Sequence, residues 1–386
     1  MKNKILFVTV ASLLLMSLFL NCEKGTPSNI KIQEMSSELY DLYQVVPTVE
    51  FGNITTIFNG EILRFENEDH YYRVLDGLQY QCDRWAEIFF TAYSNYTDDQ
   101  LSNLADSLGF DDYLPLRIFE RQFSFDRNLR AFYDEQTEIW AEQGRMTNPP
   151  TDTLINCPIE QTLLSKYYEV CLGNTIYQLR RGGTILEIPI ENVNELATIR
   201  RIDDIETIVE AYPNVVVNNG NSGQGCYMSS WYKEGWRVNP NNANKNFTWS
   251  FLYRKALVGH KYKTSITMTN YKLYNGKWKR DKINSGLASY STLYRYSYGN
   301  SSCTRFMGDT IYKDNVFPRR HWSKNKKTIS VSTIYDSSIT INGHYFIKIE
   351  TESFRINPEE SWISCYYDGY KYRYNLLTLN ETIEPY

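Results

Sequence analysis

The pattern of apolar and polar residues along the chain begins with a short apolar run near the N-terminus. Residues 5–20 are almost wholly apolar, they follow Lys2 and Lys4, and a polar stretch begins at Glu23. The run is shorter than the roughly 20 residues that span a bilayer comfortably. A basic start, a short apolar core and an abrupt polar continuation are typical of a secretory signal. We therefore predict a signal peptide over residues 1–21 and an exported protein.

Further along, turn-bounded strands and amphipathic helices follow each other up to residue 212. Asn59-Gly60 lies between two apolar runs and predicts a β-hairpin, because both residues tolerate positive φ. Apolar residues recur at steps of three and four from Tyr72 to Tyr93, which is the spacing of one helix face. Thr97 is placed to cap the next helix, and Gly109 is placed to end it.

The rest of this half predicts one more long helix and a group of short strands. Residues 117–144 read as a single helical stretch that Asn148-Pro149-Pro150 breaks. A shorter helix is expected after Pro158. Strands are expected at the following ranges: 168–172, 175–179 and 184–190. The fold class expected for this half is α+β.

After residue 212 the pattern becomes β in character. Strands are expected at ranges that include 253–263 and 266–273, and Asn275-Gly276 and Asn342-Gly343 predict two more hairpins. Short strands at this spacing favour an all-β, sandwich-like unit. The predicted organisation is a signal peptide (1–21), a lipidated Cys and tether (22–50), an acidic α+β domain (51–212), a linker (213–225) and a basic, Tyr- and Trp-rich β domain (226–386).

Charge separates the two halves more sharply than the pattern does. The whole chain has a formal net charge of −4. Residues 23–212 carry 15 Lys and Arg against 33 Asp and Glu, whereas residues 213–386 carry 24 against 12. The halves therefore have net charges of −18 and +12.

The basic half holds a candidate binding surface in which cations and aromatic residues alternate. One interpretation is a solvated face over an aromatic core; another is a site for an anionic partner; a third is a docking surface for the acidic half of the same chain. The surface would use aromatic stacking or cation–π contact as well as charge. Its predicted residues are Lys277, Trp278, Lys279, Arg280, Arg319, Arg320, Trp322, Lys324, Lys326 and Lys327.

Cysteine placement points to lipidation and permits disulfides. Cys22 directly follows the apolar run, in a segment similar to a lipobox, so we predict that it is acylated with fatty acids such as palmitate. An ordinary signal peptide with a chance cysteine is the alternative. The other cysteines are an even number without CxxC spacing, and we favour a bond within the last three. They are Cys82, Cys157, Cys171, Cys226, Cys303 and Cys365.

No recognisable catalytic or metal motif is found in the sequence. The four histidines lie in neither HExxH nor HxH spacing, and no G-x-S-x-G elbow or phosphate loop occurs. Asp98-Asp99, Asp111-Asp112 and Asp203-Asp204 are paired carboxylates, but adjacent acids at helix starts are typical of caps. We predict no catalytic residue, no metal and no cofactor.

Three motifs of the acidic half carry a resemblance to a known group of proteins. They are the hairpin over Asn59–Phe65 and the stretches over Asp98–Phe110 and Gly173–Leu179. Their order resembles that of uncharacterised envelope lipoproteins of Bacteroidota-type bacteria. The resemblance implies an outer-membrane lipoprotein, periplasmic or surface-exposed, and it implies no activity.

Together these features predict an outer-envelope lipoprotein that works as a non-catalytic binding module. The expected partner is anionic, such as an acidic glycan or lipopolysaccharide, and nucleic acid is disfavoured because no nucleic-acid-binding signature is present. Two alternatives stay open. One is a structural subunit of an envelope protein complex, and the other is a hydrolase of glycan or peptide without a recognisable motif.

Overall fold

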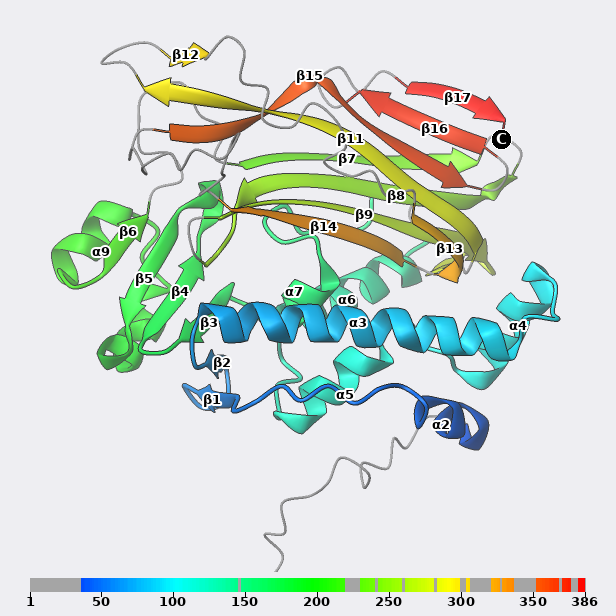
Figure 1. Cartoon of the computed structure of the whole chain (residues 1–386), viewed down its shortest axis with the longest axis horizontal. Helices are drawn as coiled ribbons and strands as arrows, with labels where there is room; N and C mark the ends of the chain where they lie inside the picture. Colours follow the sequence, from blue (N-terminus) through cyan, green and yellow to red (C-terminus); the bar gives the residue numbers. More distant parts are fainter. Residues whose placement is uncertain are drawn as a thin grey trace, which may run out of the picture.

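The computed structural model of the 386-residue chain contains three sheets and a layer of helices (Figure 1). It describes residues 36–144, 147–218, 230–239, 242–258, 261–280, 283–298, 303–305, 321–326, 328–336, 352–367, 370–375 and 381–385. The predicted signal peptide and Cys22 lie outside these residues.

The first sheet has six strands in the order β1-β2-β3-β4-β5-β6, and only β2 and β3 run parallel. Its strands are β1 (Thr55–Ile57), β2 (Ile62–Phe65), β3 (Glu169–Leu172), β4 (Thr175–Leu179), β5 (Ile185–Pro189) and β6 (Val216–Asn218). The Asn59-Gly60 turn has positive φ at both residues (57° and 82°), which confirms the predicted hairpin. Strand β6 lies inside the range expected to be linker, so the first folded part extends to Asn218.

Helices form before the first of these strands and in the segments that connect them. They are α2 (Ser37–Tyr43), α3 (Glu68–Ala92), α4 (Asp98–Leu108), α5 (Leu114–Gln122), α6 (Leu129–Glu142), α7 (Pro158–Thr162), α8 (Leu196–Ile199) and α9 (Ile205–Ala211), with 3₁₀ turns η2 (Arg181–Gly183) and η3 (Ile190–Glu195). Helix α3 confirms the predicted apolar face, and it buries Leu78, Trp85 and Phe89 completely. Thr97 forms a capping box at the start of α4, and Gly109 ends that helix with a φ of 73°.

The prediction of one helix over residues 117–144 is wrong. The structure has two helices there, and the chain turns between them at Ser124, whose φ is 50°. Asn128 then caps α6, because its side chain accepts a hydrogen bond from the backbone N–H of Ala131. Phe125 and Leu129 are both buried and four residues apart, so the apolar spacing continues across a break in the helix.

Two antiparallel sheets follow in the second half. The first has the order β10-β9-β8-β7 with β14 also paired to β9, and the second has the order β12-β11-β15-β16-β17 with β13 also paired to β11. Their strands are β7 (Ser230–Asn239), β8 (Asn242–Lys255), β9 (Lys261–Tyr274), β10 (Lys277–Arg280), β11 (Ile283–Tyr298), β12 (Cys303–Arg305), β13 (His321–Lys326), β14 (Thr328–Asp336), β15 (Glu352–Tyr367), β16 (Tyr370–Asn375) and β17 (Glu381–Pro385).

Two predicted strands and one predicted hairpin of this half can be compared directly. The strand expected at 266–273 lies within β9. Residues 253–263 do not form one strand, because β8 ends at Lys255 and β9 begins at Lys261. The hairpin at Asn275-Gly276 is confirmed, with φ values of 51° and 76° that suit a two-residue turn. The Asn342-Gly343 hairpin lies outside the described residues.

The sheet containing β7–β10 and the helical layer share one apolar core. Leu257 and Val258, which lie between β8 and β9, belong to the same buried cluster as Leu78 of α3 and Leu163 after α7. The Tyr72 hydroxyl donates a hydrogen bond to the carbonyl of Val258 at 3.0 Å. The described parts of the two halves are therefore packed against each other (Figure 1).

Candidate functional site

The four predicted binding residues on β10 do not form an open surface. Lys277 and Lys279 are exposed and Arg280 is half-buried, but Trp278 is only 2% exposed. The Trp278 ring stacks on that of Trp140 in α6, with centroids 6.3 Å apart and planes 10° from parallel. This packing places Trp278 in the contact between the sheet and the helices.

Two of the β10 cations pair with acidic residues of α6. Arg280 Nη2 lies 2.9 Å from Asp134 Oδ1, and Lys277 Nζ pairs with a carboxylate oxygen of Glu142. Burial alone would lower the pKa of Arg280, but the Asp134 carboxylate outweighs it and holds the pKa above its usual value. For these two residues the geometry supports internal docking onto the acidic half over a free anion site.

Backbone packing brings the same two elements close together. An added Cβ at Gly144, just after α6, would lie 2.0 Å from the carbonyl oxygen of Gly276 in the β9–β10 turn. Gly144 also has a φ of +60°, a backbone conformation that is unfavourable for residues with a Cβ atom. A glycine is therefore required where α6 meets this turn.

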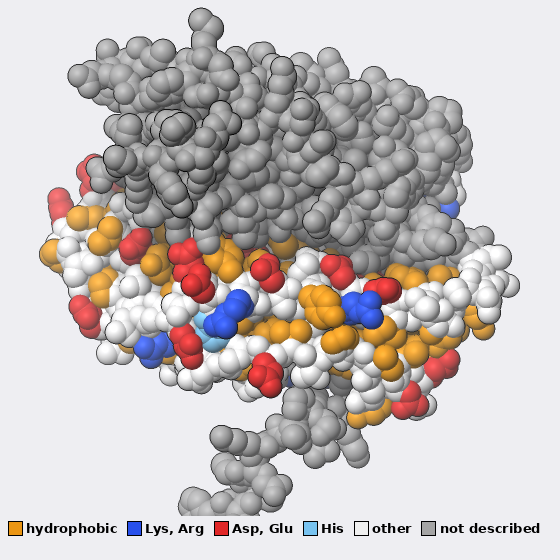
Figure 2. All heavy atoms as spheres, in the orientation of Figure 1, with side chains coloured by type: hydrophobic (Ala, Val, Ile, Leu, Met, Phe, Trp, Pro, Cys, Tyr) orange, Lys and Arg blue, Asp and Glu red, His pale blue; other side chains and the backbone are white. Residues whose placement is uncertain are grey.

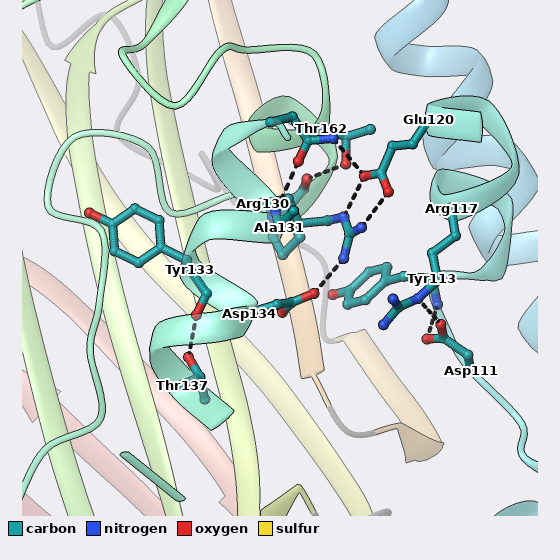
Figure 3. A network of polar contacts seen from close by, with 12 residues as sticks. Asp111, Tyr113, Arg117, Glu120, Arg130, Ala131, Tyr133, Asp134, Thr137 and Thr162 are labelled. Carbon is teal, nitrogen blue, oxygen red and sulfur yellow. Dashed lines mark hydrogen bonds and ion pairs between the residues drawn. The ribbon is translucent and has the colours of Figure 1, made fainter. Parts of the chain in front are cut away.

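A buried ion-pair network continues the contact into the helical layer. Arg130 in α6 is 4% exposed on its side chain and binds Glu120 of α5 through Nε–Oε1 (2.8 Å) and Nη2–Oε2 (2.6 Å). Its third nitrogen donates to Asp134, so the guanidinium lies between two carboxylates (Figure 3). Burial would raise the pKa of Asp134, but Arg280 and Arg130 together lower it below its usual value.

A groove of about 860 Å³ lies where α4, α5 and α6 face β9 and β10. Arg117 pairs with Asp111 across 2.5 Å on one wall, and the exposed Arg121 and Lys279 form no ion pair with any described residue. Aromatic and charged side chains thus line one cavity of ligand size. We call this cavity the groove; its polar and aromatic lining residues include Asp111, Asp112, Tyr113, Arg117, Arg121, Asp134, Thr137, Glu138, Glu142, Tyr271, Trp278, Lys279 and Arg280.

A smaller polar cavity of about 100 Å³ adjoins the groove. It shares with the groove the lining residues Tyr113, Asp134, Thr137, Tyr271 and Arg280. We call it the inner chamber. Its further lining residues include Arg130, Tyr133, Asp152, Asn156, Gln161, Thr248, Thr267 and Thr269.

Asp152, in the wall of the inner chamber, is a buried carboxylate with fixed partners. It accepts hydrogen bonds from the backbone N–H groups of Leu154 and Ile155, and from the side chains of Gln161 and Tyr168. Burial raises its pKa to about 6 even though these donors act to lower it. Two donors from its own loop, one from α7 and one from the residue before β3 hold Asp152, which is the pattern of a structural carboxylate.

Titration of Asp152 should make stability depend on pH. Its pKa is raised on folding, so between about pH 4 and 6 the folded chain keeps a proton that the unfolded chain releases, and stability falls as pH rises. A raise of about two units corresponds to about 3 kcal/mol. Urea unfolding should therefore show wild type losing about this much relative to Asp152→Asn from pH 4 to 7.

Asp204 provides the control with the opposite sign. Hydrogen bonds from Thr207 lower the pKa of this exposed carboxyl, so wild type should lose stability relative to Asp204→Asn as pH falls below about 4, and the difference should change little from pH 4 to 7. A difference between wild type and Asp152→Asn that does not change with pH would contradict the assignment.

The remaining predicted binding residues are only partly placed. Trp322, Lys324 and Lys326 belong to β13, whose backbone pairs with β11. Arg319, Arg320 and Lys327 lie outside the described residues, as does Cys22. Among the residues whose side chains the structure describes, three of the predicted set line the groove: Trp278, Lys279 and Arg280.

Cysteine positions limit the predicted disulfide. Cys82, Cys157 and Cys171 are buried thiols. Cys303 of β12 pairs with Tyr298 of β11, and Cys365 of β15 pairs with Leu287 of the same strand. Eleven residues of strand separate these positions, about 36 Å, so these two cysteines cannot bridge each other. Cys226 lies outside the described residues, and a bond to it stays a prediction.

Several residues of the groove and the inner chamber were not singled out from the sequence. Asp134 and Arg130 are four residues apart on a helix, a spacing that signals an ion pair but not its burial. Asp111 was interpreted as a cap, and its carboxylate indeed accepts from the backbone N–H of Tyr113, but it also binds Arg117. Only the fold brings these residues opposite β10.

Within the described ranges, no group of three or more His, Cys, Asp or Glu residues is arranged to hold a metal ion. Among the described helices, none has both the length and the apolar character needed for a bilayer span.

Figure 2 shows that acidic, apolar and uncharged side chains are interspersed on the face that includes α3.

Comparisons with known proteins return little for this chain. No family model and no curated protein matches it. Among solved structures, a DUF4848 family protein from Bacteroides thetaiotaomicron is 10% identical, with 86% of this chain and 98% of that chain covered. Its TM-score is 0.17, a value at which the likeness carries no argument about fold or function.

Proposed function

We propose that the chain is an envelope lipoprotein and a non-catalytic binding module that holds an acidic glycan in the groove. The observation that carries this proposal is the pair of exposed cations, Arg121 and Lys279, which line the groove and have no ion-pair partner among the described residues. A carboxylate or phosphate on the ligand would pair with these two cations. Acidic polysaccharide and lipopolysaccharide phosphate share this chemistry.

The rest of the groove supports a glycan as the anionic ligand. Its volume of about 860 Å³ lies within the range of ligand sites. Asp111 and Arg117 form a paired donor and acceptor group on one wall, and Tyr113 adds an aromatic face. Charged pairs of this kind bind hydroxyl groups, which both donate and accept hydrogen bonds.

The proposal includes the finer architecture of the second half. The two later sheets would pack as a sandwich-like unit, and their remaining cations would extend the anionic contact beyond the groove. These cations are Arg319, Arg320, Lys324, Lys326 and Lys327. An envelope protein partner on the same surface is the alternative.

Attachment through Cys22 is the localisation part of the proposal. Acyl chains contribute about 0.8 kcal/mol for each buried CH₂, and more than one chain is needed for stable anchoring. The Cys22→Ala variant should therefore leave the membrane fraction, as followed by fractionation and immunoblotting. Unchanged membrane retention would contradict lipidation at Cys22.

Glycan binding should depend on the two groove cations. An exposed charge contact contributes about 0.5–1 kcal/mol, so the Arg121→Ser/Lys279→Ser double variant should bind polygalacturonate roughly 5- to 30-fold more weakly. Affinity of the full chain in detergent should also fall as salt rises. Parallel measurements with lipopolysaccharide and DNA identify which anion is preferred.

A matched control removes the same charge elsewhere. Lys166 and Arg201 are exposed and do not line the groove, so Lys166→Ser/Arg201→Ser should retain wild-type affinity. Equal losses in both double variants would show that binding follows overall charge. No binding of any anion at low salt would contradict the proposed function.

A further inference from the structure

Two of the helices that line the groove present charges of opposite sign to it. Asp134, Glu138 and Glu142 follow one another at four-residue steps along α6, and all three line the groove. Arg117 and Arg121 are four residues apart on α5 and line it as well. We call the α6 residues the acidic wall and the α5 residues the basic wall.

Ion pairs within the chain satisfy the two outer members of the acidic wall. Asp134 lies between Arg130 and Arg280, and the Arg280 Nη2 is 2.9 Å from Asp134 Oδ1. Glu142 pairs with Lys277. Neither of these two carboxylates lacks a cation.

Glu138, between them, is different. It is exposed, and its carboxylate forms no ion pair or hydrogen bond with any described residue. Arg121 and Lys279 are exposed cations of the same groove and likewise form no ion pair with the described residues. The charges that the described lining leaves for a ligand therefore have both signs.

The two walls face a common space. Tyr113 lies between Asp134 of the acidic wall and Arg117 of the basic wall (Figure 3), and all three residues line the groove. A purely anionic ligand held by Arg121 would also meet the carboxylate of Glu138, and like charges repel. A ligand that carries an ammonium group beside its acids would form a charge-assisted hydrogen bond with that carboxylate instead.

We propose that the groove selects an acidic glycan that also contains a free amino sugar, whose ammonium group binds the carboxylate of Glu138. This inference rests on the proposed function, and it adds the second kind of charge that the ligand must carry. Carboxylates or phosphates of the same glycan pair with Arg121 and Lys279. Glu138 is then a specificity-determining residue, because an N-acetylated sugar offers it no positive charge.

A matched pair of polymers tests for the amino sugar. Heparosan alternates glucuronate with N-acetylglucosamine, and its N-deacetylated form differs only in carrying ammonium groups in place of acetamides. At about pH 6, where such amines are protonated, the full chain in detergent should bind the N-deacetylated polymer roughly 2- to 5-fold more tightly than heparosan. Equal binding of the two polymers, or a preference for heparosan, would overturn the inference.

A variant of Glu138 links this preference to the groove. Glu138→Gln keeps the size of the side chain and removes its charge, so the variant should no longer prefer the N-deacetylated polymer. It should also bind polygalacturonate roughly 2- to 5-fold more tightly than wild type does, because a repulsive charge is gone. A preference that persists in Glu138→Gln would overturn the assignment.

Glu135→Gln is the matched control. Glu135 is exposed on the same helix and does not line the groove, so this variant changes the net charge equally and should behave as wild type. An equal loss of preference in Glu135→Gln and Glu138→Gln would show that net charge alone is responsible, and would overturn the inference.

The outcomes separate this inference from the proposed function. If polygalacturonate and heparosan bind but N-deacetylation brings no gain, the amino-sugar contact fails and the proposed function stands. If the N-deacetylated polymer binds through Glu138 and Arg121→Ser/Lys279→Ser does not weaken it, the proposed anion site fails. A glutamate–lysine copolymer that binds more tightly than N-deacetylated heparosan would overturn the choice of a glycan.

Discussion

Replacing Arg130 with Met is expected to lower the free energy of unfolding by about 3–5 kcal/mol, because it leaves a buried charge without its partner. The Glu120 carboxylate is 5% exposed and receives two nitrogens of Arg130. Asp134 loses a partner in the same variant. Urea unfolding of the purified chain measures the loss.

An exposed ion pair and a double variant that replaces both buried partners serve as controls. Arg84 and Glu87 pair on the surface of α3 with 40% and 61% of their side chains exposed, so Arg84→Met should cost about 0–1 kcal/mol. Adding Glu120→Leu to Arg130→Met removes the stranded carboxylate and should recover much of the loss. Equal effects of Arg84→Met and Arg130→Met would contradict the buried network.

Replacing Trp278 with Ala should lower the free energy of unfolding by about 3–5 kcal/mol. The side chain is 2% exposed and packs against Trp140, Trp236 and Tyr271. Removing it leaves a cavity between α6 and the second sheet. Thermal and urea unfolding should both show the loss.

Tyr274, four residues earlier in the same hairpin, is the matched control. It is 55% exposed, so Tyr274→Ala should change stability by less than about 0.5 kcal/mol. If Trp278→Ala left stability intact and only weakened glycan binding, Trp278 would be a stacking residue for the ligand, as the sequence suggested.

Local chemistry made part of the fold predictable. The Asn59-Gly60 and Asn275-Gly276 turns need positive φ, and few other residue pairs supply it so readily. The cap at Thr97 and the helix end at Gly109 likewise depend on residues a few positions apart. These features need no knowledge of distant contacts.

Long-range contacts account for what could not be predicted. Lys277 and Arg280 meet Glu142 and Asp134 across 135 and 146 residues of chain, so the sequence left open whether these cations face solvent, a ligand or the acidic half. Strand alternation placed Trp278 and the lysines on opposite faces, but it could not say which face α6 would cover.

The break between α5 and α6 was missed for a different reason. Phe125 keeps the apolar spacing of a continuous helix, and the turn at Ser124 carries no glycine or proline. Such a break depends on the burial of Phe125 in the core, which is a property of the whole fold.

The most direct test of the central claim is amide hydrogen exchange of the full chain with and without polygalacturonate. The account predicts that bound glycan slows exchange in three segments that line the groove, 109–121, 134–142 and 277–280. Protection confined to residues 319–327, with exchange at these three segments unchanged, would contradict it and would place the anion site on the second cluster of cations.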